Sequence, residues 1–241
     1  METTIVMLRW IHIAAGFTAF FVAPVAMLTH KGGDAHRRWG KIYFYAMAVM
    51  ALTAVIVAAY RPNIFLLLIA IFSFYMALTG YRVLFRKRPD KGRKANALDW
   101  SAASIMLIVG AALIGLGFFA PQVLRISPII SSVFGVTGII FGGRDVQKFL
   151  RPSVQKNSWF FNHMGGMLGS YIAAVSAFSV VNFDFLPTVL RWLWPTMIGT
   201  PGIFIWINYY QKKFRKGAEA SQLAKVRIGV KEEERVPVNV E

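Results

Sequence analysis

Long apolar segments alternate with short polar ones along the first 210 residues. A membrane-spanning helix needs about 20 mainly apolar residues, and seven segments of roughly that length are bounded by charged residues, Pro or Gly. They lie at residues 4–29, 40–60, 63–85, 98–120, 127–143, 159–182 and 188–210. The pattern predicts an all-α transmembrane bundle of seven helices over residues 1–210, followed by a basic and then mixed-charge tail, 211–241, that is partly disordered.

The composition agrees with a membrane protein and excludes several classes of function. Of the 241 residues, 56% are hydrophobic and only 16% are charged, whereas soluble domains carry about 25% charged residues. The chain has no cysteine, which excludes a disulfide framework, a thiolate nucleophile and a Cys-ligated metal centre. Only Met-Glu-Thr-Thr precedes the first apolar segment, so we expect that segment to be a helix and not a cleaved signal peptide.

The basic residues fall in alternate connections between the predicted helices. Of 27 Lys and Arg residues, 23 lie in the first, third and fifth connections and in the tail, and only Arg9, Arg61, Arg125 and Arg191 lie on the other side. Lys and Arg in short loops mark the cytoplasmic side of a membrane protein. The chain is therefore expected in a bacterial inner membrane as a multi-pass protein, with its N-terminus outside and its tail inside.

The same distribution explains the net charge of +16. Such a charge would otherwise favour a nucleic-acid partner, but basic residues that follow the topology need only membrane lipids and the anionic inner leaflet. We expect no nucleic-acid partner. Faces of Gly and Ala, such as Gly138 and Gly142 in one segment and Ala111 and Gly115 in another, favour close helix packing, either within the chain or with a helix of a partner or a second copy.

Ionisable residues in or beside the spans are the functional candidates, because burying them costs several kcal/mol. No catalytic motif such as G-x-S-x-G, a P-loop or HExxH is present, so enzyme activity stays open. The topology places most candidates at the inner end, where they could converge on a metal ion or a proton path. The candidate ligand or proton-relay residues are His12, His36, His163, His30, Asp34, Asp99 and Asp145. The alternative for each is a structural one: His12 would bond to a neighbouring helix, and Asp99 and Asp145 would pair with a nearby Arg.

A haem is a further alternative, with two histidines as axial ligands. At 1.5 Å per residue, His12 and His163 lie about 16 Å apart along the membrane normal, so they cannot share one iron. His36 or His30 lies at the depth of His163. If a b-type haem is bound, His36 and His163 are the expected ligands.

Three segments resemble a known family. His36-Arg37-Arg38-Trp39-Gly40-Lys41-Ile42-Tyr43 resembles an HR-x-x-G-x-(I/L)-Y signature, His12-Ile13-Ala14-Ala15-Gly16 an H-x-x-A-G start, and the run from His163 through Met167, Ser170 and Tyr171 to Ala174 an H-x-x-x-M-x-x-S-Y-I-A motif. These motifs are typical of a family of bacterial multi-pass membrane proteins that is catalogued as a domain of unknown function. The resemblance covers roughly the first 180 residues. It implies a membrane fold with His12, His36 and His163 as signature histidines, and it implies no activity.

Three functions follow as hypotheses. The first is a membrane protein that binds or transports a small molecule, an ion or protons at a His/Asp polar cluster near the cytoplasmic side. The second is a redox protein with b-type haem that exchanges electrons with quinone. The third is a structural subunit that packs against a larger complex through its Gly and Ala faces.

Overall fold

A computed structural model describes residues 2–87, 94–152 and 157–233. Within these ranges the chain is helical and contains no strand. The helices are α1 (Glu2–Leu28), α2 (Asp34–Tyr60), α3 (Ile64–Arg82) with a 3₁₀ turn η1 (Val83–Arg86), α4 (Ala97–Phe119), α5 (Pro121–Leu124), α6 (Pro128–Leu150), α7 (Ser158–Asn182) and α8 (Thr188–Glu233). The prediction of an all-α architecture is confirmed.

Six of the helices in the described ranges are long and apolar enough to cross a membrane: α1, α2, α3 with η1, α4, α6 and α7. They correspond to the first six predicted segments. The seventh segment, 188–210, forms the first half of α8, which is not among the six. It carries Arg191, Pro195 and Pro201, and these residues lower its mean hydropathy.

Two helices are longer than their apolar segments. α2 begins at Asp34, six residues before the predicted start, because Gly33 serves as its N-cap and Asp34 occupies its first turn. α6 continues to Leu150 and not to residue 143, and it ends two residues before Pro152. Polar helical turns beyond an apolar segment leave no hydrophobic signal. Residues up to Glu233 of the predicted partly disordered tail continue α8, and residues 234–241 lie outside the described ranges.

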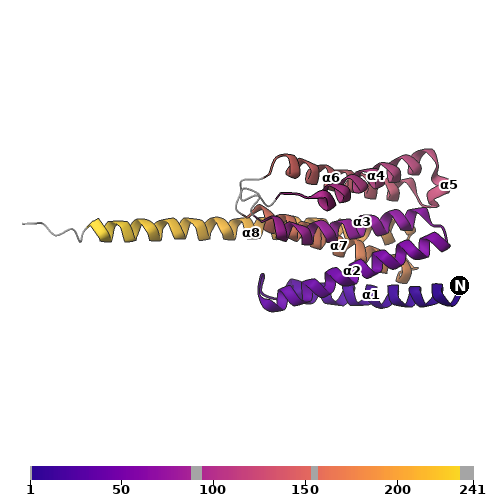
Figure 1. The fold of residues 1–241 in the computed structure, drawn as a ribbon, viewed down its shortest axis with the longest axis horizontal. Helices are drawn as coiled ribbons and strands as arrows, with labels where there is room; N and C mark the ends of the chain where they lie inside the picture. Colours follow the sequence, from indigo (N-terminus) through magenta and orange to yellow (C-terminus); the bar gives the residue numbers. More distant parts are fainter. Residues whose placement is uncertain (1, 88–93, 153–156, 234–241) are drawn as a thin grey trace, which may run out of the picture. The chain divides into compact units, whose positions relative to one another are not determined.

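The chain divides into two units, residues 1–199 and 200–241. In the first unit the helices pack in pairs, α1 on α2, α3 on α7 and α4 on α6, and α3 also contacts α2 and α4 (Figure 1). Two cores result. One joins α3, α4 and α6 around Phe72, Met106 and Phe134, and the other joins α1, α2, α3 and α7 around Ala19, Met47 and Ala77.

Small residues make these pairs close. A Cβ added to Gly166 of α7 would lie 2.7 Å from Cα of Gly80 in α3, and one added to Gly110 of α4 would lie 2.8 Å from the carbonyl oxygen of Gly135 in α6. The Gly166 side of the sixth predicted segment is therefore a helix–helix contact. These glycines serve contacts within the chain.

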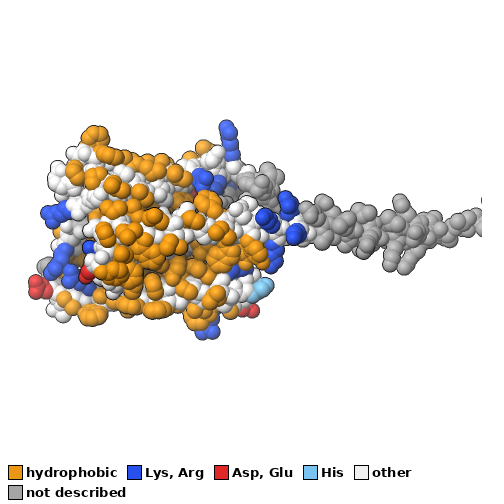
Figure 2. Space-filling view, turned by 180° about the vertical axis from the view of Figure 1, so that it is seen from behind, with side chains coloured by type: hydrophobic (Ala, Val, Ile, Leu, Met, Phe, Trp, Pro, Cys, Tyr) orange, Lys and Arg blue, Asp and Glu red, His pale blue; other side chains and the backbone are white. Residues whose placement is uncertain are grey.

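The outside of the bundle is apolar. Trp10, Phe21, Leu52 and Ile108 each expose more than 60% of their surface. Figure 2 shows hydrophobic side chains covering the middle of one face, with Lys, Arg, Asp and Glu toward its two ends. In water such an exposed face would be costly, and in lipid it is the expected surface. The chain is compatible with an integral multi-pass membrane protein.

Candidate functional site: a histidine pair and two carboxylate clusters

His36 and His163 meet at the end of the bundle that carries the α1–α2 loop. His36 lies in the first turn of α2, and His163 lies in the second turn of α7. Their ring centres are 6.2 Å apart and their planes are inclined at 81°. The fold thus brings the rings of these two candidate residues into contact with each other. Both residues are half-buried.

Each ring is fixed by a backbone carbonyl on another helix. Nδ1 of His36 lies 2.9 Å from the carbonyl oxygen of Ala26 in α1, and Nδ1 of His163 lies 2.7 Å from that of Gly80 in α3. Because a carbonyl only accepts, Nδ1 carries the proton in both neutral rings, and Nε2 presents a lone pair. Both rings are thus bonded through Nδ1 to the backbone of a neighbouring helix. The pair thus offers two basic nitrogens.

The surroundings of the pair are cationic. Lys31 is close enough to both rings, and Lys87 to His163, for their charges to interact. The Lys31 ammonium donates to the carbonyl oxygen of Met27 at the end of α1, and burial lowers the pKa of Lys31. The Nζ atom of Lys87 lies 4.2 Å from the ring centre of Trp159. Two ammonium groups therefore lie beside the two imidazoles at this end of the bundle.

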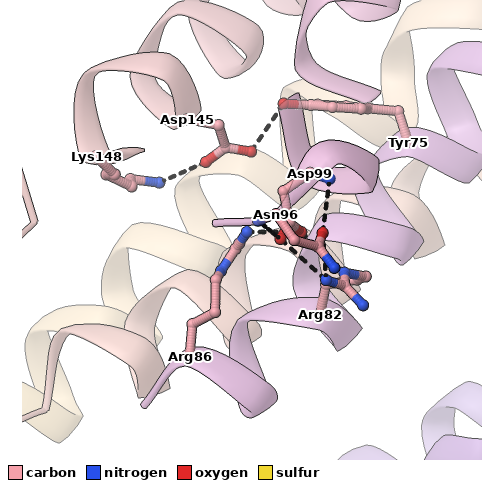
Figure 3. Close-up of polar contacts among 7 residues, drawn as sticks. All are labelled: Tyr75, Arg82, Arg86, Asn96, Asp99, Asp145 and Lys148. Atoms are coloured by element: carbon pink, nitrogen blue, oxygen red, sulfur yellow. Dashed lines mark hydrogen bonds and ion pairs between the residues drawn. The ribbon is translucent and has the colours of Figure 1, made fainter. Parts of the chain in front are cut away.

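Asp99 forms a separate cluster at the start of α4 (Figure 3). Arg82 Nε donates to its Oδ1 at 2.8 Å and Arg82 Nη2 to its Oδ2 at 2.9 Å. Arg86 Nη1 forms an ion pair with Oδ1 at 2.6 Å, although its geometry is not that of a hydrogen bond. Asn96 and Asp99 also form a capping box on α4. The Asp99 side chain is 2% exposed, so its charge is neutralised in place.

Asp145 is held in α6 by two neighbours (Figure 3). The Tyr75 hydroxyl of α3 donates to Oδ2 at 2.8 Å, and the Lys148 ammonium donates to Oδ1 at 2.9 Å. The expected Arg neighbour, Arg144, is not the partner. Residues i and i+1 point away from each other on a helix, whereas i and i+3 share a face.

The other three candidates lie apart from the histidine pair. Nδ1 of His12 lies 3.1 Å from the carbonyl oxygen of Met50 and 3.0 Å from Oγ1 of Thr53, so this ring joins α1 to α2, as the packing alternative predicts. His30 is exposed in the α1–α2 loop. Asp34 is fully exposed and lies 3.7 Å from Arg37.

The expected His/Asp cluster is therefore divided. Among the described residues no group of three or more His, Asp or Glu side chains could hold a metal ion. Asp99 and Asp145 form ion pairs with basic side chains, and His36 and His163 form a pair that contains no carboxylate. Sequence reasoning did not identify the partners Arg82, Arg86 and Tyr75, because they lie 13 to 70 positions away from the acids in the chain.

Comparison with protein-family models, with curated proteins and with solved structures finds no match for this chain.

Proposed function

We propose that this chain is a multi-pass protein of a bacterial inner membrane that binds a small molecule, an ion or a proton at the His36–His163 pair. The observation that carries the proposal is the pair itself: two imidazoles from α2 and α7, each tied through Nδ1 to a carbonyl, with ring centres 6.2 Å apart. Fixing one nitrogen of a histidine leaves the other as a proton acceptor or ligand in a set direction.

The proposed orientation has the N-terminus outside and the pair at the cytoplasmic end. The loops that contain Lys31, Lys87 and Arg151 lie at this end of the helices, and they hold most of the basic residues between spans. A site there would exchange protons or ligand with the cytoplasm. In this proposal the first half of α8 is a seventh crossing that returns the tail to that side.

Proton or ion movement is tested with full-length protein in liposomes that trap a pH-sensitive dye. We expect an imposed potential to drive dye quenching in wild-type liposomes. His36→Gln and His163→Gln, which keep a polar side chain but remove the titrating ring, are expected to return quenching to the level of empty liposomes. His30→Gln is the matched control, since His30 is exposed at the same end. Equal quenching in all four proteins would refute a proton role for the pair.

A b-type haem held by His36 and His163 is the second candidate, because two imidazoles from α2 and α7, each bonded through Nδ1, lie with their ring centres 6.2 Å apart.

The residues fit such a group as ligands. His36 and His163 would hold the iron, and the carbonyls of Ala26 and Gly80 would keep both Nε2 atoms unprotonated. A bound haem would supply one-electron redox chemistry. The test is an absorption spectrum of detergent-purified protein, oxidised and dithionite-reduced, with metal analysis. A Soret band that is absent from His36→Ala and His163→Ala but kept in His12→Ala supports haem. A colourless, iron-free protein from haem-supplied cells excludes it.

A further inference from the structure

A cavity lies at the opposite end of the bundle from the histidine pair. Its volume is about 260 Å³. Its polar lining comes from Asn63, Arg125, Thr188 and Arg191, and Phe65, Leu124 and Trp192 are among its apolar walls. These residues belong to the α2–α3 loop, α3, α5 and the start of α8, and α5 is at the end away from the α1–α2 loop (Figure 1).

The two arginines are unusual for their side of the molecule. Arg125 and Arg191 are two of the four basic residues that the sequence pattern assigns to the side poor in Lys and Arg, and both line this cavity. Arg and Lys on the outer side oppose the charge rule that orients membrane proteins, so the pair of guanidiniums is not explained by topology.

Arg191 is placed with part of its guanidinium unused. Its Nη1 lies 2.9 Å from Oδ1 of Asp184, whose side chain is 88% exposed. Its Nε is buried, and no hydrogen-bond partner for it is found within the described ranges. A buried donor of a charged group without an acceptor is costly, and a ligand oxygen would remove that cost.

Arg125 adopts a strained backbone. It caps α5 with φ 53° and ψ 36°, the left-handed conformation that glycine adopts most easily at a helix end. It is the single non-glycine residue with positive φ among the described residues. No carboxylate of the described ranges lies within ion-pair distance of its side chain. Backbone strain of this kind clusters at residues whose side chains have a functional role.

Trp192 is packed into the cavity wall between two other aromatic rings. The Trp192 ring packs edge-to-face on Phe65 at 5.1 Å and on Phe134 at 5.8 Å, and the residue is 4% exposed. A ligand therefore meets a preformed apolar surface with cationic groups at its rim.

We infer that this cavity binds a small organic anion, with its carboxylate between Arg191 and Arg125 and its apolar body against Trp192 and Leu124. Arginine binds carboxylates and phosphates in pairs of charge-assisted hydrogen bonds. The apolar wall requires an apolar body, and the volume limits it to a small one. The anionic group can belong to a soluble carboxylate or to the headgroup of an anionic lipid.

The test uses full-length protein in nanodiscs of neutral phosphatidylcholine, and the probes are benzoate and its uncharged analogue benzamide. Benzoate is expected to raise the Tm in a saturable manner, and benzamide is not. Arg191→Gln is expected to weaken benzoate binding at least about tenfold. Arg9→Gln is the matched control, because Arg9 lies at the same end and does not line the cavity.

Arg125→Gly separates a binding role from a structural one. Glycine suits the left-handed backbone, so this variant should keep or raise the Tm without ligand, while its affinity for benzoate should fall by a similar factor. Nanodiscs that contain phosphatidylglycerol distinguish the two sources: an Arg191-dependent rise in Tm without benzoate identifies a lipid headgroup as the anion. Benzoate binding that is equal in all variants, or no response to either anion, would overturn the inference.

Discussion

Asp99 carries its charge at a point where its side chain is 2% exposed, and Arg82 and Arg86 neutralise it. Asp99→Asn keeps the shape and part of the capping box but leaves two half-buried guanidiniums without a counter-ion. Removing one partner of a buried ion pair costs about 3–5 kcal/mol. We expect a loss of unfolding free energy in this range, measured by thermal or denaturant unfolding in detergent.

The control for this prediction is Asp34→Asn. Asp34 also begins a helix, but its side chain is fully exposed and its distance to Arg37 is 3.7 Å. Exposed pairs contribute little, and we expect unchanged unfolding. Equal effects of the two substitutions would show that the Asp99 cluster does not stabilise the bundle.

Tyr75 joins α3 to the carboxylate of Asp145. Tyr75→Phe removes only the hydroxyl, so Asp145 retains Lys148 and loses one buried hydrogen bond. A hydrogen bond to a charged group contributes about 1.5–3 kcal/mol, and a fall in stability of about this size is expected by the same unfolding measurement. Tyr60→Phe is the control, because Tyr60 is 53% exposed. Unchanged stability of the Tyr75→Phe protein would mean that a water molecule can replace the Tyr75 hydroxyl as the hydrogen-bond donor to Asp145.

At the residue scale, the sequence predicted the depth of the histidines better than it predicted the partners of the acids. The depth argument matched His163 with His36 or His30 and separated it from His12, and in the structure it is the His36 ring that contacts His163, while His30 is exposed. The acids were expected to join the histidines. They do not, because two arginines and a lysine form ion pairs with them. The hydropathy of a segment does not predict which of its polar side chains will face a neighbouring helix.

Between elements, the contact of α3 with α7 depends on Gly80 and Gly166. A Cβ on Gly166 would lie 2.7 Å from Cα and 2.9 Å from N of Gly80. Both atoms are backbone and cannot rotate away, so Gly166→Ala should push the helices apart and cost about 1–3 kcal/mol. Because Gly80 also supplies the acceptor for His163, the same change should disturb the histidine pair.

Gly165→Ala is the matched control, one residue away. Nothing lies within 4 Å of its added Cβ, and alanine is the better helix former by about 1 kcal/mol. We expect equal or higher stability in thermal unfolding. If Gly165→Ala and Gly166→Ala behave alike, helix propensity and not the α3–α7 contact governs this helix.

Helix existence was predictable for the spans because an apolar segment of span length has few alternatives in a membrane. The positions of the helix ends were less predictable. The polar first turn of α2, from Asp34, and the last turns of α6, to Leu150, lie outside the apolar segments. His36 belongs to the first of these extensions. A site at the boundary between helix and loop is thus placed by helix capping, which hydropathy leaves out.

For the whole molecule, the arrangement of charges sets a requirement on α8. With the N-terminus outside, as proposed, six crossings would return the chain to that side and leave the eight basic residues of the tail outside. Each Lys or Arg near an anionic inner leaflet gains about 1 kcal/mol, so that arrangement opposes several kcal/mol of attraction. We therefore expect residues 188–210 to cross, even with Arg191, Pro195 and Pro201.

Cysteine labelling measures the orientation directly, because the chain has no cysteine of its own. Gln122→Cys, Lys94→Cys and Gly217→Cys each introduce one thiol at an exposed position. A membrane-impermeant maleimide should label Gln122→Cys in intact spheroplasts, and it should label the other two only after permeabilisation. Labelling of Gly217→Cys from outside, with Lys94→Cys still protected, would mean that α8 does not cross. The histidine pair would remain inside in that case, and the tail would have to be held outside by something other than lipid charge.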